Sequence, residues 1–452
     1  MVQIIKPFQS GLLSVYQSAV EDLVHRRNGT RPAPGLRPGL EDEFVRLATA
    51  AAAGHQAAQA AGAGRLVSPS GAAGLARTCA ELGLDYLKAR LAGDDRRAEQ
   101  IIEDDLRMSQ CDPGWAETVD DYLKYFGPDG SPLEIPYVRA GQVGDAVIEM
   151  KPDARVALIG DWGTGTDAAI ELLRQVKMHR PDIVIHLGDI YYSGTDTECD
   201  SYFRRIVEDV LRRDAPIPVY TLAGNHDMYS GGGGFYRLID TLNAPPDRQR
   251  ASFFCLRDKA GAFQFVAMDT GLHDYDPFNV GDGLTRLEDD EADWHVRRIA
   301  EWKDGRTILL SHHQLFSAFS QIGPRDASGR LHPVNPNLLP RLRSFQQAGP
   351  IAAWFWGHEH NLCIYRPYAG LDRGRCAGHG GIPVFVEDRP YDVPDGLMDA
   401  PELIPGTKLA TNGPVYAHGF VMIAFDSAGR SARVDYFQDT DPERPLYSET
   451  LA

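Results

Sequence analysis

The chain has 452 residues, of which 43% are hydrophobic and 24% are charged, so it has the composition of a globular protein with a large core. Its net charge of −17 disfavours nucleic acids and anionic membranes as partners, because both are negatively charged. A phosphate-bearing ligand would need local positive charge at its site, which metal ions would supply.

The cysteines and the N-terminus indicate a compartment. Six cysteines are scattered without a Cys-x-x-Cys pair, which argues against a zinc ribbon or a thioredoxin motif and favours reduced thiols. The start, MVQIIKPFQSGLLSVYQSAV, has no unbroken apolar stretch typical of a signal peptide. The sequence contains no run of about 18 apolar residues, so no membrane-spanning helix is predicted. We therefore expect a cytoplasmic protein that does not bind membranes.

Residues 1–126 are predicted to form a helical domain. The segment 41–64 is rich in alanine, begins with acidic residues and ends in glycine, and 71–93 repeats apolar residues at helical spacing. Between helices, RPAPGLRPG (31–39) is typical of a loop. We expect this domain to mediate oligomerisation or to bind a partner.

A change of pattern follows this domain. Residues 127–154 are rich in Pro, Gly and Asp and are predicted to be a linker or connecting hairpin. In residues 155–452, short apolar runs alternate with helical segments, which predicts an α/β domain with strands buried on both faces. The expected strands are VALIG (156–160), DIVIHLG (182–188), PVYTLAG (218–224), FQFVAMD (263–269), TILLSH (307–312), IAAWFWG (351–357), GFVMIAFD (419–426) and ARVDYFQD (432–439).

Polar side chains follow five of these strands, at the edge where open α/β sheets bind ligands. Each alone has an ordinary explanation, such as a helix cap, a turn or a loop histidine. Together they are oxygen and nitrogen donors of the kind that bind transition metals, and they outnumber the needs of one tetrahedral ion. The set predicts two metal ions, about 3.5–4 Å apart, that share one carboxylate. Its members are Asp161, Asp189, Asn225, His226, His312, His313, His358 and His360.

The stretch WFWGHEHNLCIY (354–365) contributes two of these histidines. Its aromatic part is predicted to end a buried strand. In the extended segment that follows, residues i and i+2 point to the same side. His358 and His360 are therefore expected to reach two neighbouring ions from one short piece of backbone.

The motifs around these residues resemble those of the calcineurin-like metallophosphoesterase superfamily, in the same order, over residues 155–436. Within it, the chain most resembles purple acid phosphatases of the small, tartrate-resistant type. The resemblance implies a four-layer α/β/β/α sandwich, and it does not include the N-terminal helical region. The matching stretches are GDWG (160–163), GDIYY (188–192), AGNHD (223–227), SHHQLFS (311–317) and GHEHNL (357–362).

The resemblance implies a distribution of ligands over two metal sites. Asp189 is expected to bridge the ions. Asp161, Tyr192 and His360 would complete the first site, and Asn225, His312 and His358 the second. Relatives usually have Pro where this chain has Gln314, so the choice between His312 and His313 stays open, although position in the motif favours His312.

A tyrosine ligand is expected because this chain, like purple acid phosphatases, lacks a histidine ligand that many relatives have. Many relatives have a histidine where this chain has Gly163, and purple acid phosphatases, which also have glycine, use a tyrosine three residues after the bridging aspartate. That residue is Tyr192 here, beside its neighbour Tyr191. A phenolate favours Fe³⁺, so we expect Fe³⁺ with Fe²⁺, Mn²⁺ or Zn²⁺, and a Mn²⁺ pair as the alternative.

The predicted activity is hydrolysis of a small phosphoester, preferably a phosphomonoester, by a metal-bound hydroxide. Two cations acidify a shared water and bind phosphate oxygens. His226 resembles the family's substrate-positioning histidine and general acid, and His313 is a second catalytic candidate. The alternatives are a phosphodiesterase on the same site, or a metal-stabilised scaffold that binds a partner without turnover.

Overall fold

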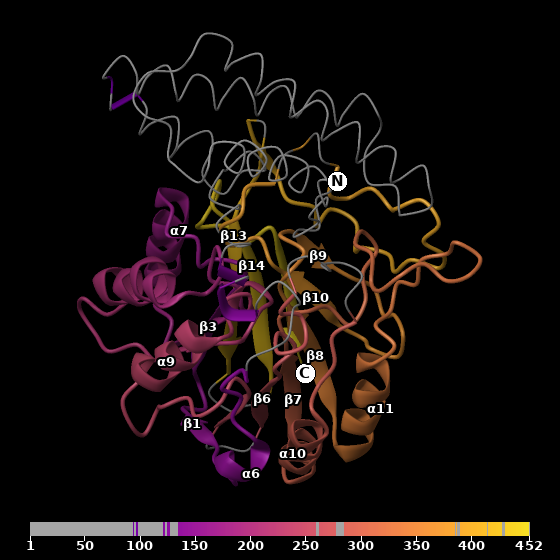
Figure 1. The fold of residues 1–452 in the computed structure, drawn as a ribbon, viewed down its shortest axis with the longest axis horizontal. Helices are drawn as coiled ribbons and strands as arrows, with labels where there is room; N and C mark the ends of the chain where they lie inside the picture. The colour runs from indigo at the N-terminus through magenta and orange to yellow at the C-terminus, as the bar shows by residue number, and fades with distance from the viewer. Residues whose placement is uncertain are drawn as a thin grey trace. The chain divides into compact units, whose positions relative to one another are not determined.

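The computed structural model describes residues 134–258, 262–276, 284–384, 389–413, 415–426 and 430–451, with positions 94, 96, 97, 121, 122, 124–126 and 386. The helical domain expected for residues 1–126 lies outside the described residues, except at these few positions. Residues 125–275 and 282–452 form one compact unit, which holds all the elements below (Figure 1).

A six-stranded sheet has the order β15-β14-β13-β2-β3-β4. Strands β2, β3 and β4 are parallel, whereas β13, β14 and β15 are antiparallel to their neighbours. Five of the expected strands are confirmed here. The bounds are β2 Arg155–Ile159, β3 Ile183–His186, β4 Val219–Thr221, β13 Gly419–Phe425, β14 Ala432–Gln438 and β15 Tyr447–Leu451.

A seven-stranded sheet has the order β1-β5-β6-β7-β8-β10-β9, and its central strands β6, β7, β8 and β10 are parallel. The other three expected strands, β6, β7 and β8, are confirmed here. The bounds are β1 Ile148–Met150, β5 Phe254–Asp258, β6 Phe263–Ala267, β7 Arg306–Leu310, β8 Ile351–Trp356, β9 Leu362–Ile364 and β10 Gly374–Ala377. A separate ribbon pairs β11 (Thr411–Asn412) with β12 (Val415–Tyr416).

The segment 127–154, which was expected to be a linker, contributes to this sheet. Its described part contains the short helix α6 (Ala140–Val143) and strand β1, which pairs with β5 at the edge of the seven-stranded sheet. The segment therefore carries regular structure as well as connecting the chain.

The two sheets pack face to face around an apolar core, and helices cover their outer faces. Strand β8 shows why its sequence is apolar throughout: Ala353 and Phe355 face the core between the sheets, and Trp354 and Trp356 face the helices. The expected α/β/β/α sandwich is confirmed (Figure 1). The six-stranded sheet packs against α7 (Asp167–Met178), η2 (Cys199–Arg204), η3 (Val207–Leu211) and α9 (Gly233–Leu242), and the seven-stranded sheet against α6, α10 (Asp289–Ala300) and α11 (Leu338–Ala348).

Helix α7 illustrates how local sequence fixes these outer layers. Its N-cap, Thr166, accepts a hydrogen bond from Ala169 N at 3.2 Å. The helix buries Leu172, Leu173 and Val176, which share one face at helical spacing. Two further helices are short: α8 (Asp196–Glu198) precedes η2, and η4 (His226–Met228) follows β4. Within the described residues, no helix combines the length and the hydropathy that crossing a bilayer requires.

Candidate metal centre

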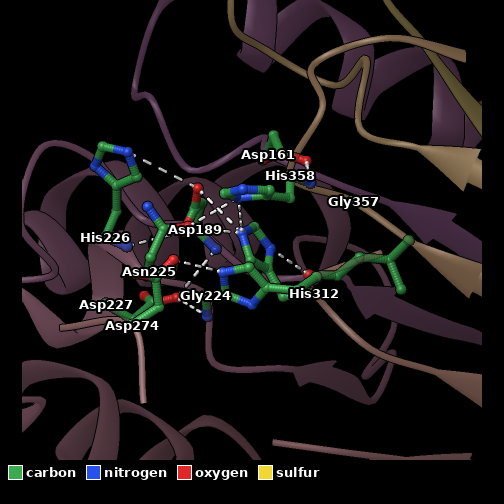
Figure 2. A network of polar contacts seen from close by, with 12 residues as sticks. Asp161, Asp189, Gly224, Asn225, His226, Asp227, Asp274, His312, Gly357 and His358 are labelled. Atoms are coloured by element: carbon green, nitrogen blue, oxygen red, sulfur yellow. Dashed lines mark hydrogen bonds and ion pairs between the residues drawn. The ribbon is translucent and has the colours of Figure 1, made fainter. Parts of the chain in front are cut away.

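The carboxyl ends of strands from both sheets meet at one place, where most of the predicted site residues lie (Figure 2). Asp161 follows β2 and Asp189 follows β3, whereas His312 follows β7 and His358 follows β8. Contacts cross from one sheet to the other. Asp161 Oδ2 accepts a hydrogen bond from His358 N at 2.8 Å, and His312 Nε2 lies 3.4 Å from Asp189 Oδ2.

Both aspartates are buried and closely approach the loops that follow β4 and β8. Their relative exposures are 0% for Asp161 and 1% for Asp189. Asp189 Oδ1 accepts a hydrogen bond from His226 N at 3.0 Å. A side chain at Gly357 would place a Cβ 2.6 Å from Asp161 Oδ2, and one at Gly224 would overlap Asp189 Oδ1. Glycine is therefore required at both positions for the carboxylates to reach the centre.

The three residues expected in the second site are brought together. Asn225 Oδ1 lies 3.1 Å from His312 Nε2 and 3.0 Å from His358 Nδ1. His312 Nδ1 donates to Leu187 O at 2.9 Å, so its Nε2 is directed at the centre. Asn225 Nδ2 donates to Tyr229 Oη at 2.6 Å, which leaves Oδ1 for a metal ion.

The tyrosine whose hydroxyl lies beside the carboxylates is Tyr191, whereas the spacing predicted Tyr192 as the ligand. The Tyr191 hydroxyl lies 3.1 Å from Asp189 Oδ2, 3.3 Å from Asp161 Oδ1 and 3.0 Å from His360 Nε2. The backbone of Tyr192 instead donates to Glu198 Oε1 at 2.5 Å and accepts from His226 Nδ1 at 2.7 Å. Spacing from Asp189 does not by itself distinguish the two adjacent tyrosines.

His360 completes this group of donors. Its Nε2 lies 3.6 Å from Asp161 Oδ1, and 29% of its side chain is exposed. Gly163, where many relatives are expected to have histidine, has no room for a side chain. A Cβ there would lie 2.7 Å from Asp189 O and 2.8 Å from Ile190 Cα. A tyrosine in place of a histidine is therefore consistent with the local packing.

His226 lies beside the carboxylates with a defined ring orientation. Its Nδ1 must carry the proton, because it donates to the carbonyl oxygen of Tyr192. Its Nε2 then faces Asp189 Oδ2 at 4.0 Å. Burial lowers the pKa of His226, which favours the neutral ring in the metal-free chain.

His313 is held on both ring nitrogens by side chains of the loop after β6. Its Nδ1 contacts Thr270 Oγ1 at 3.1 Å, and its Nε2 contacts Asp274 Oδ2 at 3.0 Å. Both ring nitrogens are thus engaged by protein groups. The ring also packs 4.4 Å from that of His358. These contacts favour a structural role at the centre over proton transfer to a substrate.

Sequence reasoning missed three groups that support the centre. The Asp227 carboxylate accepts hydrogen bonds from the backbone N–H groups of Gly224 and Asp189 at 2.8 and 3.0 Å. Burial raises the pKa of Asp227 to about 8. Thr270 and Asp274 follow β6, an expected strand whose end was not considered. Their position after a predicted strand was the only sequence signal, and it does not show that they meet His313.

The donor set fits metal cations. Donor atoms of Asp161, Asp189 and His312 all lie within 4.8 Å of one another, and so do those of His312, His313 and His358. Burial and the neighbouring Asp189 raise the pKa of Asp161 well above its usual value. Burial lowers the pKa of His312, but the two carboxylates outweigh this and raise it to about 9. Bound cations would favour the ionised form of these buried carboxylates.

Comparison with known proteins finds one matching family model and several similar solved structures. Residues 154–362 match the family model described as calcineurin-like phosphoesterase. No curated protein matches the chain. The chain is similar to the solved structure of GAP50, the anchor in the inner membrane complex of Plasmodium. The two are 15% identical, the match covers 66% of this chain and 88% of that chain, and the TM-score is 0.44. It is also similar to a dimetal phosphatase from Danio rerio, with 14% identity, coverage of 67% and 99%, and a TM-score of 0.42.

Proposed function

We propose that the protein is a metal-dependent phosphoesterase that hydrolyses phosphomonoesters, because residues 154–362 match the family model of calcineurin-like phosphoesterases. The observation that carries this proposal is the convergence of buried carboxylate, amide, phenol and imidazole donors from both sheets. Bound cations would offset the net negative charge of the protein where an anionic substrate must approach.

In the proposed centre, Asp189 would be shared by two metal ions. Its Oδ2 is the atom that contacts donors of both groups, Tyr191 on one side and His312 on the other. Asp161, Tyr191 and His360 would hold the first ion, and Asn225, His312 and His358 the second. When bound, the ions would acidify a water molecule and stabilise charge on phosphoryl oxygens. The phenol supports Fe³⁺ in the first site, with Fe²⁺, Mn²⁺ or Zn²⁺ in the second, or a Mn²⁺ pair.

His226 is the proposed catalytic residue outside the ligand set. The Tyr192 carbonyl holds its Nδ1–H, so Nε2 is the atom that exchanges a proton or hydrogen-bonds with the substrate. Once Nε2 is protonated, the ring would donate a hydrogen bond to a phosphoryl oxygen beside Asp189, or would give the Nε2 proton to the leaving alkoxide and return to the neutral form protonated on Nδ1. His226 is buried against the rings of Tyr191 and Tyr229, which restrict its rotation.

The decisive experiment combines metal analysis with two substrates. Purified protein is expected to contain about two metal ions per chain. It is also expected to hydrolyse p-nitrophenyl phosphate faster than bis-p-nitrophenyl phosphate. Preference for the diester would move the proposal to a phosphodiesterase. Bound metal without turnover of either ester would favour a non-catalytic scaffold, and no bound metal after addition of Mn²⁺ or Fe²⁺ would refute the centre.

Two further expectations complete the proposal. Residues 1–126 would mediate oligomerisation or bind a partner, which size measurement of the full chain and of a chain that begins at residue 127 would test. A cytoplasmic location is supported by the free thiols of the cysteines that the structure describes, Cys199, Cys255, Cys363 and Cys376. Fractionation of cells that express the protein would test it.

A further inference from the structure

The loop after β6 contributes a sixth strand end to the centre. It runs from Met268 to Tyr275 and carries Thr270, which is 0% exposed, and Asp274, which is 7% exposed. A Cβ at Gly271 would lie 2.7 Å from Ala223 O, so this loop packs directly against the backbone that leads to Asn225. The loop thus lies beside the proposed second metal site.

This loop engages the backbone N–H and both ring nitrogens of His313. Thr270 Oγ1 accepts the His313 backbone N–H at 3.0 Å and contacts Nδ1 at 3.1 Å. Asp274 Oδ2 contacts Nε2 at 3.0 Å. Because a carboxylate accepts hydrogen bonds, Nε2 carries a proton, and Nδ1 then accepts from the Thr270 hydroxyl. Each ring nitrogen of His313 therefore has a hydrogen-bond partner of the complementary kind.

The loop is itself held in place. Asp269 Oδ1 accepts hydrogen bonds from Gly271 N and Leu272 N at 3.0 and 2.9 Å. Asp269 N donates to the buried Glu291 of α10 at 2.9 Å. Asp274 N donates to Gly271 O at 2.9 Å. These bonds fix Thr270 and Asp274 before any ligand is present.

The held ring contacts both histidines of the proposed second site. The His313 ring lies 4.4 Å from that of His358 and 4.8 Å from that of His312. We propose that Asp274 and Thr270 are positioning residues. They hold the His313 ring so that it packs against the His358 ring and thereby fixes the orientation of His358 in the second metal site. This inference rests on the proposed metal centre, and it adds residues that act through His313 rather than on the substrate.

The test is Mn²⁺ binding by calorimetry to the full chain and to paired variants. We expect Asp274→Ala and Thr270→Val to weaken one of two Mn²⁺ binding events about tenfold, within the range seen for partners of metal-binding histidines. Asp274→Asn and Thr270→Ser keep an acceptor or a hydroxyl and should largely restore affinity. Asp209→Ala, an exposed site on another element, serves as the control.

The melting temperature of the metal-free proteins separates positioning from folding. An unchanged melting temperature with one weakened Mn²⁺ site supports the inference. Equal loss of both sites with a lower melting temperature overturns it, because the residues would then support the fold as a whole. Unchanged Mn²⁺ affinities in both variants also overturn it and leave the metal centre intact. Absence of Mn²⁺ binding by the unmodified protein overturns both proposals.

Discussion

Asp161 Oδ2 accepts the backbone N–H of His358 at 2.8 Å across 197 positions of the chain. This hydrogen bond joins the end of β2 in one sheet to the end of β8 in the other. It requires the absence of a side chain at Gly357, where a Cβ would lie 2.6 Å from the same carboxylate oxygen. The proposed metal centre is therefore built at the junction of two sheets, and each sheet alone carries only part of the donor set.

The first prediction concerns the shared carboxylate. We expect Asp189→Ala to lose both metal ions, because Asp189 contacts Tyr191 of one donor group and His312 of the other. Elemental analysis of the purified variant measures this directly, with the exposed Asp153→Ala as a control. Two ions retained by Asp189→Ala would disprove the bridging position.

The second prediction separates the two adjacent tyrosines. Tyr191→Phe removes the hydroxyl that contacts Asp161, Asp189 and His360 and should weaken the first metal site, whereas Tyr192→Phe should retain it. If the unmodified protein holds Fe³⁺, only Tyr191→Phe should lose a tyrosinate-to-iron absorption band. Loss of the band or of the metal in Tyr192→Phe alone would restore the assignment made from spacing.

The third prediction concerns His226. His226→Ala should keep both metal ions and lose about 10²- to 10⁴-fold of the turnover rate, the usual contribution of a positioned acid or base. Steady-state kinetics with p-nitrophenyl phosphate, alongside elemental analysis of the same sample, provide the measurement. Unchanged kinetics would remove His226 from the mechanism, and loss of metal would make its role structural.

The fourth prediction concerns stability and pH in the metal-free chain. Burial raises the pKa of Glu291 from 4.5 to about 8, and the folded carboxyl accepts hydrogen bonds from Tyr137 and Asp269. A raised pKa means that the folded state binds more protons than the unfolded state between these values. The contribution of Glu291 is thus fully present below pH 4.5 and declines as pH rises to about 8.

Glu291→Gln tests this dependence, since glutamine has no proton to lose. Its free energy of unfolding, measured with urea at several pH values, should fall less between pH 5 and 8 than that of the unmodified protein. Parallel curves for the two proteins would show that Glu291 does not titrate in this window.

Much of the fold followed from local patterns. Parallel strands buried on both faces must be apolar, so β2, β3, β4, β6, β7 and β8 were recognisable as short runs. Strands β1, β5, β9, β10, β11, β12 and β15 were not predicted. β1 lies in a segment whose composition indicated a linker, and β9 and β10 follow the metal-site loop in a stretch with weak alternation. Their pairing depends on neighbouring strands rather than on their own sequence.

The sequence by itself determined that polar donors end the buried strands, because the carboxyl ends of parallel strands meet at a common edge of the sheet. Only the tertiary structure decided which side chains face the centre. Tyr191 and Tyr192 differ by one position, and the path of the loop directs the hydroxyl of Tyr191 to the carboxylates. Asp274 and Thr270 meet His313 across 39 and 43 positions, a proximity set by the packing of β6 beside β7. Spacing along the chain contains no information about such distant contacts.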